Sequence, residues 1–292
     1  MTSIVLFAGF DANDDQNLWV TDGTAAGTSE LVVAGADPSF GLQPSDLTAF
    51  GSEVLFNGSD ANGNPNLWVT DGTAAGTSEL SVASTNNLQP SDLTVFGSEV
   101  LFSGADASTA GQGLWVTDGT GAGTSELAVA NTNTFQGFNP TDLTVFGSEV
   151  LFAGTDANDY QNLWVTDGTA GGTSELAVAG ASSSFGLRPN FMTVFGSEVL
   201  FNGLDTSGHD GLWVTDGTAA GTSELPVAGA ASFGLNPANF AVFGSEVLFS
   251  GESASGSPGL WVTDGTTPVT ASSDVPADVP SLTQRFWCEF ES

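Results

Sequence analysis

The sequence predicts an all-β fold built from six repeats of about 49 residues, on three observations. The string Leu-Trp-Val-Thr-Asp-Gly-Thr occurs six times, with its tryptophans 47 to 49 residues apart. A second string, Phe-Gly-Ser-Glu-Val-Leu-Phe, precedes five of the six at a nearly constant distance. The 38 glycines and 12 prolines favour turns and strands over helices. The repeated tryptophans are Trp19, Trp68, Trp115, Trp164, Trp213 and Trp261.

Four short strands, a to d in chain order, are expected in each repeat. In the repeat that spans residues 92–129 they are 92–96, 99–103, 114–117 and 125–129. Gly97 and Ser98 join strands a and b, and a two-residue Gly-Ser loop suits a type II′ hairpin. An Asp-Gly pair begins the turn from strand c to strand d. No segment of the repeat has helical periodicity, so four antiparallel strands are predicted.

Six small antiparallel sheets, each unable to bury both faces alone, predict a six-bladed β-propeller with four antiparallel strands per blade. A linear β-solenoid is the alternative, although its rungs are usually shorter than this repeat. Because the repeats run through the chain without a linker, residues 1–292 are expected to form one domain.

The two ends of the sequence predict how the ring closes. The chain begins with a strand b at residues 4–7 and has no strand a before it. Residues 280–286, Pro-Ser-Leu-Thr-Gln-Arg-Phe, repeat the strand a pattern one residue short. Pairing of the N- and C-terminal segments in one blade would remove the open sheet edge of a linear array.

Charge and composition exclude several classes of partner. The 34 acidic and two basic residues give a formal net charge of −32, which repels nucleic acid and anionic lipid. No apolar run approaches the ~20 residues needed for a membrane span, so no membrane insertion is expected. The N-terminus lacks the features of a cleavable signal peptide. The single cysteine, Cys288, excludes a disulfide within the chain.

The Leu-Trp-x-x-Asp-Gly-Thr-x-x-Gly-Thr core resembles the ELWxxDGTxxGT repeats of large bacterial proteins, some of them described as hyalin-like. The residue before Leu-Trp is Asn or Gly in this chain, never Glu. The resemblance implies an extracellular or cell-surface setting but no uniform activity. The Asp-Gly-Thr hairpin is also similar to the Asp-box turn of sialidase-type propellers. Sialidases hold the substrate carboxylate with an arginine cluster, whereas this chain has only Arg188 and Arg285.

A propeller places the b–c and d–a connections on one face and the a–b and c–d turns on the other. The turns are nearly identical from repeat to repeat, whereas the b–c and d–a connections vary, so binding is expected on the variable face. The Asp of each Asp-Gly-Thr turn is expected to accept backbone N–H groups, and each repeated Trp to pack between blades. The repeated Glu of strand b is expected at the rim; an acidic ring around the channel is the alternative. This Glu series is Glu53, Glu99, Glu149, Glu198 and Glu246.

Most of the candidate binding residues lie on the b–c connections, and Asp60, Asn62 and His209 are expected to be free of structural duty, so that replacing them leaves stability almost unchanged. Asp11, Asn13 and Asp15 alternate along one connection like the start of a calcium loop, so calcium is the candidate cofactor. The same residue types also form ordinary turns. Rare side chains lie on consecutive connections: the single tyrosine, the first arginine and the single histidine. The candidate ligand-binding residues are Asp11, Asp60, Asn62, Asp106, Asp156, Tyr160, Arg188, Asp205 and His209.

The d–a connections contribute aromatic residues. Phe40-Gly-Leu42, Phe185-Gly-Leu187 and Phe233-Gly-Leu235 share one pattern, and Phe135 with Phe138 stands in the corresponding place. These side chains either plug the core, the interpretation that we favour, or line a recognition groove.

Six copies of a weak site produce avidity, whereas catalysis needs one asymmetric set of groups. The sequence therefore predicts a non-enzymatic multivalent binding or assembly module. Carbohydrate fits because carboxylates, amides and aromatic rings suit sugars, and a protein partner is the other candidate. The enzyme alternative is a hydrolase that uses paired carboxylates on the variable-loop face or in the central channel.

Overall fold

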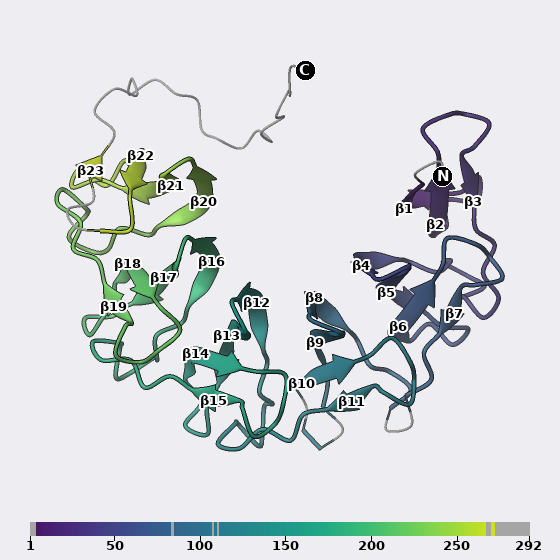
Figure 1. Ribbon diagram of the computed structural model, residues 1–292, viewed down its shortest axis with the longest axis horizontal. Helices are drawn as coiled ribbons and strands as arrows, with labels where there is room; N and C mark the ends of the chain where they lie inside the picture. Colours follow the sequence, from purple (N-terminus) through teal and green to yellow (C-terminus); the bar gives the residue numbers. More distant parts are fainter. Residues whose placement is uncertain (1–3, 83–84, 107, 110, 267–269, 272–292) are drawn as a thin grey trace.

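The computed structural model describes residues 4–82, 85–106, 108–109, 111–266 and 270–271. Within them the chain forms 23 strands and no helix, so no helix in these ranges could span a membrane. The strands make six antiparallel sheets, of which the first has three strands and the other five have four. The sheets stand side by side along an arc, and each sheet turns one of its edges toward the centre of the arc (Figure 1). This is the arrangement of a β-propeller.

The strands occur in the predicted order a, b, c, d within each sheet. Strands a line the concave side of the arc, where they neighbour one another, and strands d lie on the convex side (Figure 1). Strands a are β4 (Ser45–Phe50), β8 (Ser91–Phe96), β12 (Thr141–Phe146), β16 (Asn190–Phe195) and β20 (Ala238–Phe243). Strands b are β1 (Val5–Phe10), β5 (Glu53–Ser59), β9 (Glu99–Ala105), β13 (Glu149–Thr155), β17 (Glu198–Leu204) and β21 (Glu246–Glu252).

The two outer strands complete each sheet. Strands c are β2 (Gln16–Thr21), β6 (Pro65–Thr70), β10 (Gln112–Thr117), β14 (Gln161–Thr166), β18 (Asp210–Thr215) and β22 (Pro258–Thr263). Strands d are β3 (Ser29–Glu30), β7 (Ser78–Glu79), β11 (Ser125–Glu126), β15 (Ser174–Glu175), β19 (Ser223–Glu224) and β23 (Thr270–Ala271). Strand d is therefore shorter than the predicted 125–129. The chain leaves the sheet edge after Glu126 because Leu127 and Val129 pack toward the next sheet.

The tight a–b hairpin forms as predicted. In the third sheet Phe96 pairs with Glu99, so Gly97 and Ser98 are the whole loop. Gly97 has a φ of 64°, and Ser98 is not among the residues with positive φ, as a type II′ turn requires.

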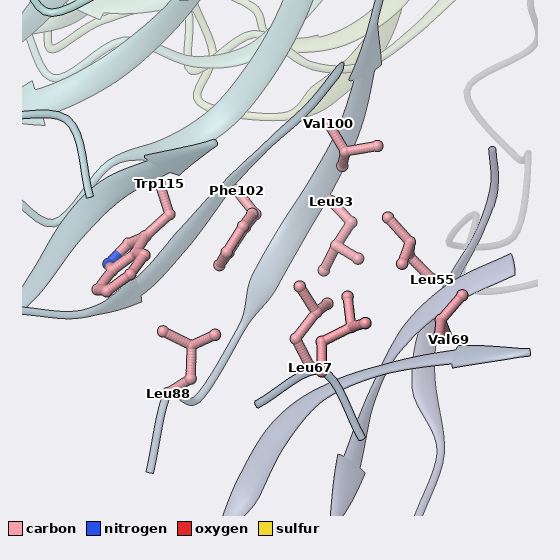
Figure 2. Close-up of a cluster of buried hydrophobic side chains, with 9 residues drawn as sticks. Leu55, Leu67, Val69, Leu88, Leu93, Val100, Phe102 and Trp115 are labelled. Carbon is pink, nitrogen blue, oxygen red and sulfur yellow. The ribbon is translucent and has the colours of Figure 1, made fainter. Parts of the chain in front are cut away.

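The hydrophobic core lies between the sheets. Leu55, Leu67 and Val69 of the second sheet cluster with Phe102 and Trp115 of the third (Figure 2). Equivalent clusters join the other neighbouring sheets. The last five repeat tryptophans are each only 1% exposed, which confirms their predicted packing between sheets: Trp68, Trp115, Trp164, Trp213 and Trp261.

The two ends of the arc differ from its interior. The first sheet lacks a strand a, as predicted, and the described sheets do not close into a ring (Figure 1). At the first end Val5 and Phe7 are exposed and Trp19 is half-buried, because none of the described sheets covers their face. At the other end Leu260 is half-buried, whereas its equivalents in the other five repeats are fully buried: Leu18, Leu67, Leu114, Leu163 and Leu212. The predicted closing strand, residues 280–286, lies outside the described residues.

Candidate ligand-binding face

The predicted division into two faces is confirmed. The d–a connections bond to the b–c connections of the next sheet: Ala157 N–H donates to the Asn131 carbonyl at 2.8 Å. The a–b and c–d turns meet on the opposite side, where a Cβ built on Gly168 would lie 3.5 Å from Glu99 Oε2. We call the surface of the b–c and d–a connections the loop face and the opposite surface the turn face. The b–c connections of the loop face include residues 11–15, 60–64, 156–160, 205–209 and 253–257.

On the turn face, each Asp-Gly-Thr aspartate is committed to its own turn. Asp118 Oδ1 accepts the Thr120 backbone N–H at 2.9 Å and the Thr120 hydroxyl at 2.7 Å. These bonds, the hydroxyl's first, lower the pKa of the Asp118 carboxyl. The same pair of bonds recurs in all six repeats, which confirms the structural interpretation of the series. The repeated Glu of strand b lies beside the turn of the next sheet: Glu149 Oε2 would be 3.5 Å from a Cβ built on Gly217, as Glu99 Oε2 would be from one on Gly168.

On the loop face, the predicted ligand carboxylates also organise their own loops. Asp60 is buried, and its Oδ1 accepts the backbone N–H groups of Asn62 at 2.8 Å and Asn64 at 2.9 Å. Burial raises the pKa of the Asp60 carboxyl, but the hydrogen bonds outweigh it and the pKa is lowered. Corresponding bonds hold Asp11, Asp106, Asp156 and Asp205. The expectation that Asp60 is free of structural duty is therefore wrong.

The calcium hypothesis does not fit the geometry around Asp11. Asp11 Oδ1 accepts the backbone N–H groups of Asn13 at 2.8 Å and Asp15 at 3.0 Å. The Asn13 side chain directs its amide nitrogen to Asp11 Oδ2 at 3.2 Å. Donors rather than oxygen ligands thus surround this carboxylate, whereas Ca²⁺ needs six to eight oxygens. In the described part of the chain no three His, Cys, Asp or Glu side chains gather as a metal site.

Two of the three rare side chains lie in one hollow of the loop face. Tyr160 and Arg188 line a cavity of about 450 Å³ between the b–c connection of the fourth sheet and the d–a connections on either side. The Arg188 backbone N–H donates to the Gln161 carbonyl at 2.9 Å, and Tyr160 N–H donates to Asp156 Oδ1 at 2.8 Å. Both segments of the hollow are therefore anchored to the sheet.

His209 lies in the neighbouring, smaller hollow of about 130 Å³. Its backbone N–H donates to Asp205 Oδ1 at 2.9 Å, as Tyr160 does to Asp156 in the preceding sheet. Asp210 follows it; burial raises the pKa of this carboxyl, and the nearby charge of Arg188 offsets part of the rise. The three rare residues thus line two adjacent hollows of one face.

The Phe and Leu residues of the d–a connections divide into two groups. Leu42, Leu88, Phe138, Leu187 and Leu235 plug the core and are at most 3% exposed. The preceding phenylalanines point outward, each more than half exposed, so the favoured interpretation that they plug the core is wrong for them. These residues are Phe40, Phe135, Phe185 and Phe233. Their position between adjacent b–c connections is shown by Phe185, which lies 3.8 Å from a Cβ built on Gly208.

A carboxylate pair that the sequence reasoning missed recurs beside the loop face. Burial first, and then the charge of Asp156, raise the pKa of the Glu175 carboxyl, whose Oε1 accepts the Asn162 amide N–H at 2.7 Å. Asp60 has the same effect on Glu79, and Asp205 on Glu224. The repeated Ser-Glu of strand d was the signal, but its proximity to the b–c connection depends on the sheet geometry.

Comparisons with known proteins support the fold alone. No family model and no curated protein matches the chain. Similar solved structures include a puromycin hydrolase (TM-score 0.57, 16% identity), a xyloglucanase from Xanthomonas campestris (0.53, 15%) and a puromycin-hydrolysing peptidase from Mycobacterium tuberculosis (0.50, 14%). They match 93%, 92% and 94% of this chain, which covers 44%, 45% and 45% of them. The chain spans less than half of their length, and at this identity the likeness carries no activity over.

Proposed function

We propose that the chain is a non-enzymatic, multivalent binding module that engages carbohydrate through its loop face. The observation that carries the proposal is the series of exposed phenylalanines, Phe40, Phe135, Phe185 and Phe233, which lie on four of the five d–a connections between the six sheets. Exposed rings beside amides and hydroxyls can stack on the apolar face of a sugar while polar groups bind its hydroxyls. Because each site is small and repeated, affinity would come from simultaneous contacts with one glycan.

A glycan array probed with the whole chain tests this proposal. Replacing the four phenylalanines by serine should weaken binding about 100-fold, because avidity is lost with the repeated contacts. The matched control replaces four exposed turn-face serines by alanine: Ser52, Ser98, Ser148 and Ser197. Equal loss in both variants, or none in either, would refute the loop face as the binding surface. Binding to a protein and to no glycan would leave the scaffold alternative.

The hydrolase alternative rests on the repeated carboxylate pairs, such as Asp156 with Glu175. Their raised glutamate pKa resembles that of a general acid. The pairs recur in at least three sheets with the same partners, which favours a structural origin over one catalytic centre. Glycan hydrolysis abolished by Glu175→Gln alone would favour the enzyme.

We further propose that the six sheets close into a six-bladed ring. Every internal interface joins a leucine-bearing face to the tryptophan-bearing face of the next sheet. The uncovered faces at the two ends of the arc are one of each kind, so they suit each other. If the ring closes, Leu260→Ala should cost about 3 kcal/mol, as should Leu212→Ala inside the arc. A cost for Leu260→Ala below about 1 kcal/mol would show an uncovered end.

A further inference from the structure

We propose that the hollow of the fourth sheet around Tyr160 and Arg188 is a site for an uncharged hexopyranose unit of a glycan. This inference rests on the proposed carbohydrate-binding function and goes beyond it by assigning one hollow and one ligand class. The hollow, about 450 Å³, is within the range of small-molecule sites.

The walls of the hollow are built as part of the fold. Gly186 has a φ of 77°, and a Cβ there would lie 2.5 Å from the Gln161 carbonyl oxygen and 3.0 Å from Tyr160 Cβ. Only glycine therefore lets the d–a connection close against Tyr160. The next residue, Leu187, donates its backbone N–H to Asn162 Oδ1 at 2.9 Å. On the far side Asn133 Nδ2 donates to Asp159 Oδ1 at 3.0 Å, which joins the preceding connection to the same wall.

The lining combines the two kinds of group that recognise sugars. Tyr160 and the exposed Phe185 supply aromatic surface. The Gln136 amide can both donate to and accept from hydroxyl groups, and the Asn158 amide oxygen can accept from them. The Asn158 amide nitrogen already donates to Asp156 Oδ2 at 3.2 Å. The Asn139 amide shapes the wall through its bonds to Gln112, Gln136 and Gly137. Arg188 adds donors in a fixed fork but no acceptor. A ring of hydroxyls with one apolar face matches this lining.

Charge favours a neutral ligand over an anionic one. The carboxylate of Asp159 lines the same hollow as Arg188 and balances its charge. Arg188 also lies close enough to Asp210 to influence its pKa, which burial raises and the arginine lowers. The chain as a whole carries a formal charge of −32, which repels anions.

Comparison with the other sheets singles out the fourth. The position of Tyr160 is occupied by Asp15, Asn64, His209 and Ser257 in other b–c connections. The position of Arg188 is occupied by Gln43, Gln89, Asn139 and Asn236, all with a φ near 50° like Arg188 itself. Tyr160→Asn and Arg188→Gln therefore install residues that the same backbone already accepts in the second sheet.

The test is saturation-transfer NMR and calorimetry on the full chain with methyl pyranosides of glucose, galactose, mannose, fucose, N-acetylglucosamine and N-acetylgalactosamine. At least one should bind, with Kd in the millimolar range expected of a small open site. Tyr160→Asn should weaken this binding at least about tenfold, through loss of stacking and a hydroxyl, and Arg188→Gln about threefold. Ser257→Asn, which installs the same residue at the same repeat position of the sixth sheet, should leave it unchanged.

Each other outcome overturns the assignment. Binding that survives Tyr160→Asn but falls with Phe40→Ser or Phe233→Ser would refute this hollow and leave the proposed function standing. No binding of any pyranoside at about 20 mM would refute the site, while the glycan array would still decide the function separately. Tighter binding of methyl glucuronide than of methyl glucoside would refute the neutral ligand class.

Discussion

The turn face and the loop face use the same device for different ends. On both, an aspartate accepts backbone N–H groups two or more residues later, as Asp118 and Asp60 do. On the turn face the residues around this aspartate are almost the same in every repeat. On the loop face the aspartate recurs in five repeats but the residue four positions later changes: Asp15, Asn64, Tyr160 and His209 are examples. The recurring acid is thus scaffold on both faces, and the changing neighbour is where binding can differ.

Of the aspartates on the two faces, the loop-face aspartate should have the larger effect on stability when it is replaced. Asp60 is a buried, charged acceptor for the N–H groups of Asn62 and Asn64, so Asp60→Ala should cost about 2 kcal/mol in urea unfolding. Asn62→Ala is the control: its side chain contributes one bond of 3.4 Å to Asp60 Oδ2, and its loss should cost less than about 0.5 kcal/mol. Equal urea midpoints for Asp60→Ala and the wild type would contradict the scaffold role of the loop-face aspartate.

The turn-face aspartate should matter less. Asp118 is exposed, so water can replace the bonds that Asp118→Ala removes. We expect a smaller drop in the urea midpoint than for Asp60→Ala, with glycan binding per folded molecule unchanged. Loss of binding in a variant that stays folded would place function on the turn face.

Lowering the pH should affect stability in opposite directions through the strand d glutamates and through the turn aspartates. Burial and then a neighbouring Asp raise the pKa of Glu79, Glu175 and Glu224 above 4.5, so the folded chain binds protons first. Stability should therefore rise modestly as the pH falls from 7 toward about 5. Hydrogen bonds, first from a Thr hydroxyl, lower the pKa of each turn aspartate from 3.8. The unfolded chain therefore takes up these protons first, and stability should fall as the pH falls through about 4.

The urea midpoint, measured from pH 7 to pH 3, checks both effects. Glu175→Gln should reduce only the rise in midpoint between pH 7 and about pH 5. Asp118→Asn should reduce only the fall in midpoint at lower pH. A monotonic fall in stability from pH 7 would contradict the raised glutamate pKa values.

Salt should have the smallest effect, and an unspecific one. Screening of repulsion within a chain of net charge −32 should raise the unfolding temperature by a few degrees at about 0.1 M salt. Calcium chloride should match sodium chloride at equal ionic strength, because donors surround the Asp11 carboxylate. Markedly greater stabilisation by calcium would restore the metal hypothesis that the geometry disfavours.

The sequence was a good guide wherever one repeat specifies its own structure. Strands a to c, the Gly97-Ser98 hairpin, the Asp118 turn and the missing first strand all follow from local patterns. It failed where two repeats meet. That Leu187 is buried while Phe185 faces outward, or that Glu175 approaches Asp156, depends on how one sheet's connection lies over the next.

Because the interface between sheets is repeated, whole sheets can be removed from or added to this protein. Among the described residues, each inner sheet packs against its two neighbours through faces that are chemically alike from one junction to the next. Excising one whole period, for example residues 149–197, would join Ser148 to Glu198, as Ser148 is now joined to Glu149. The new junction would unite a leucine face and a tryptophan face that already fit. Such modularity lets a lineage gain or lose sheets by recombination between near-identical segments, with each new internal junction made from two faces that already pack together elsewhere in the chain.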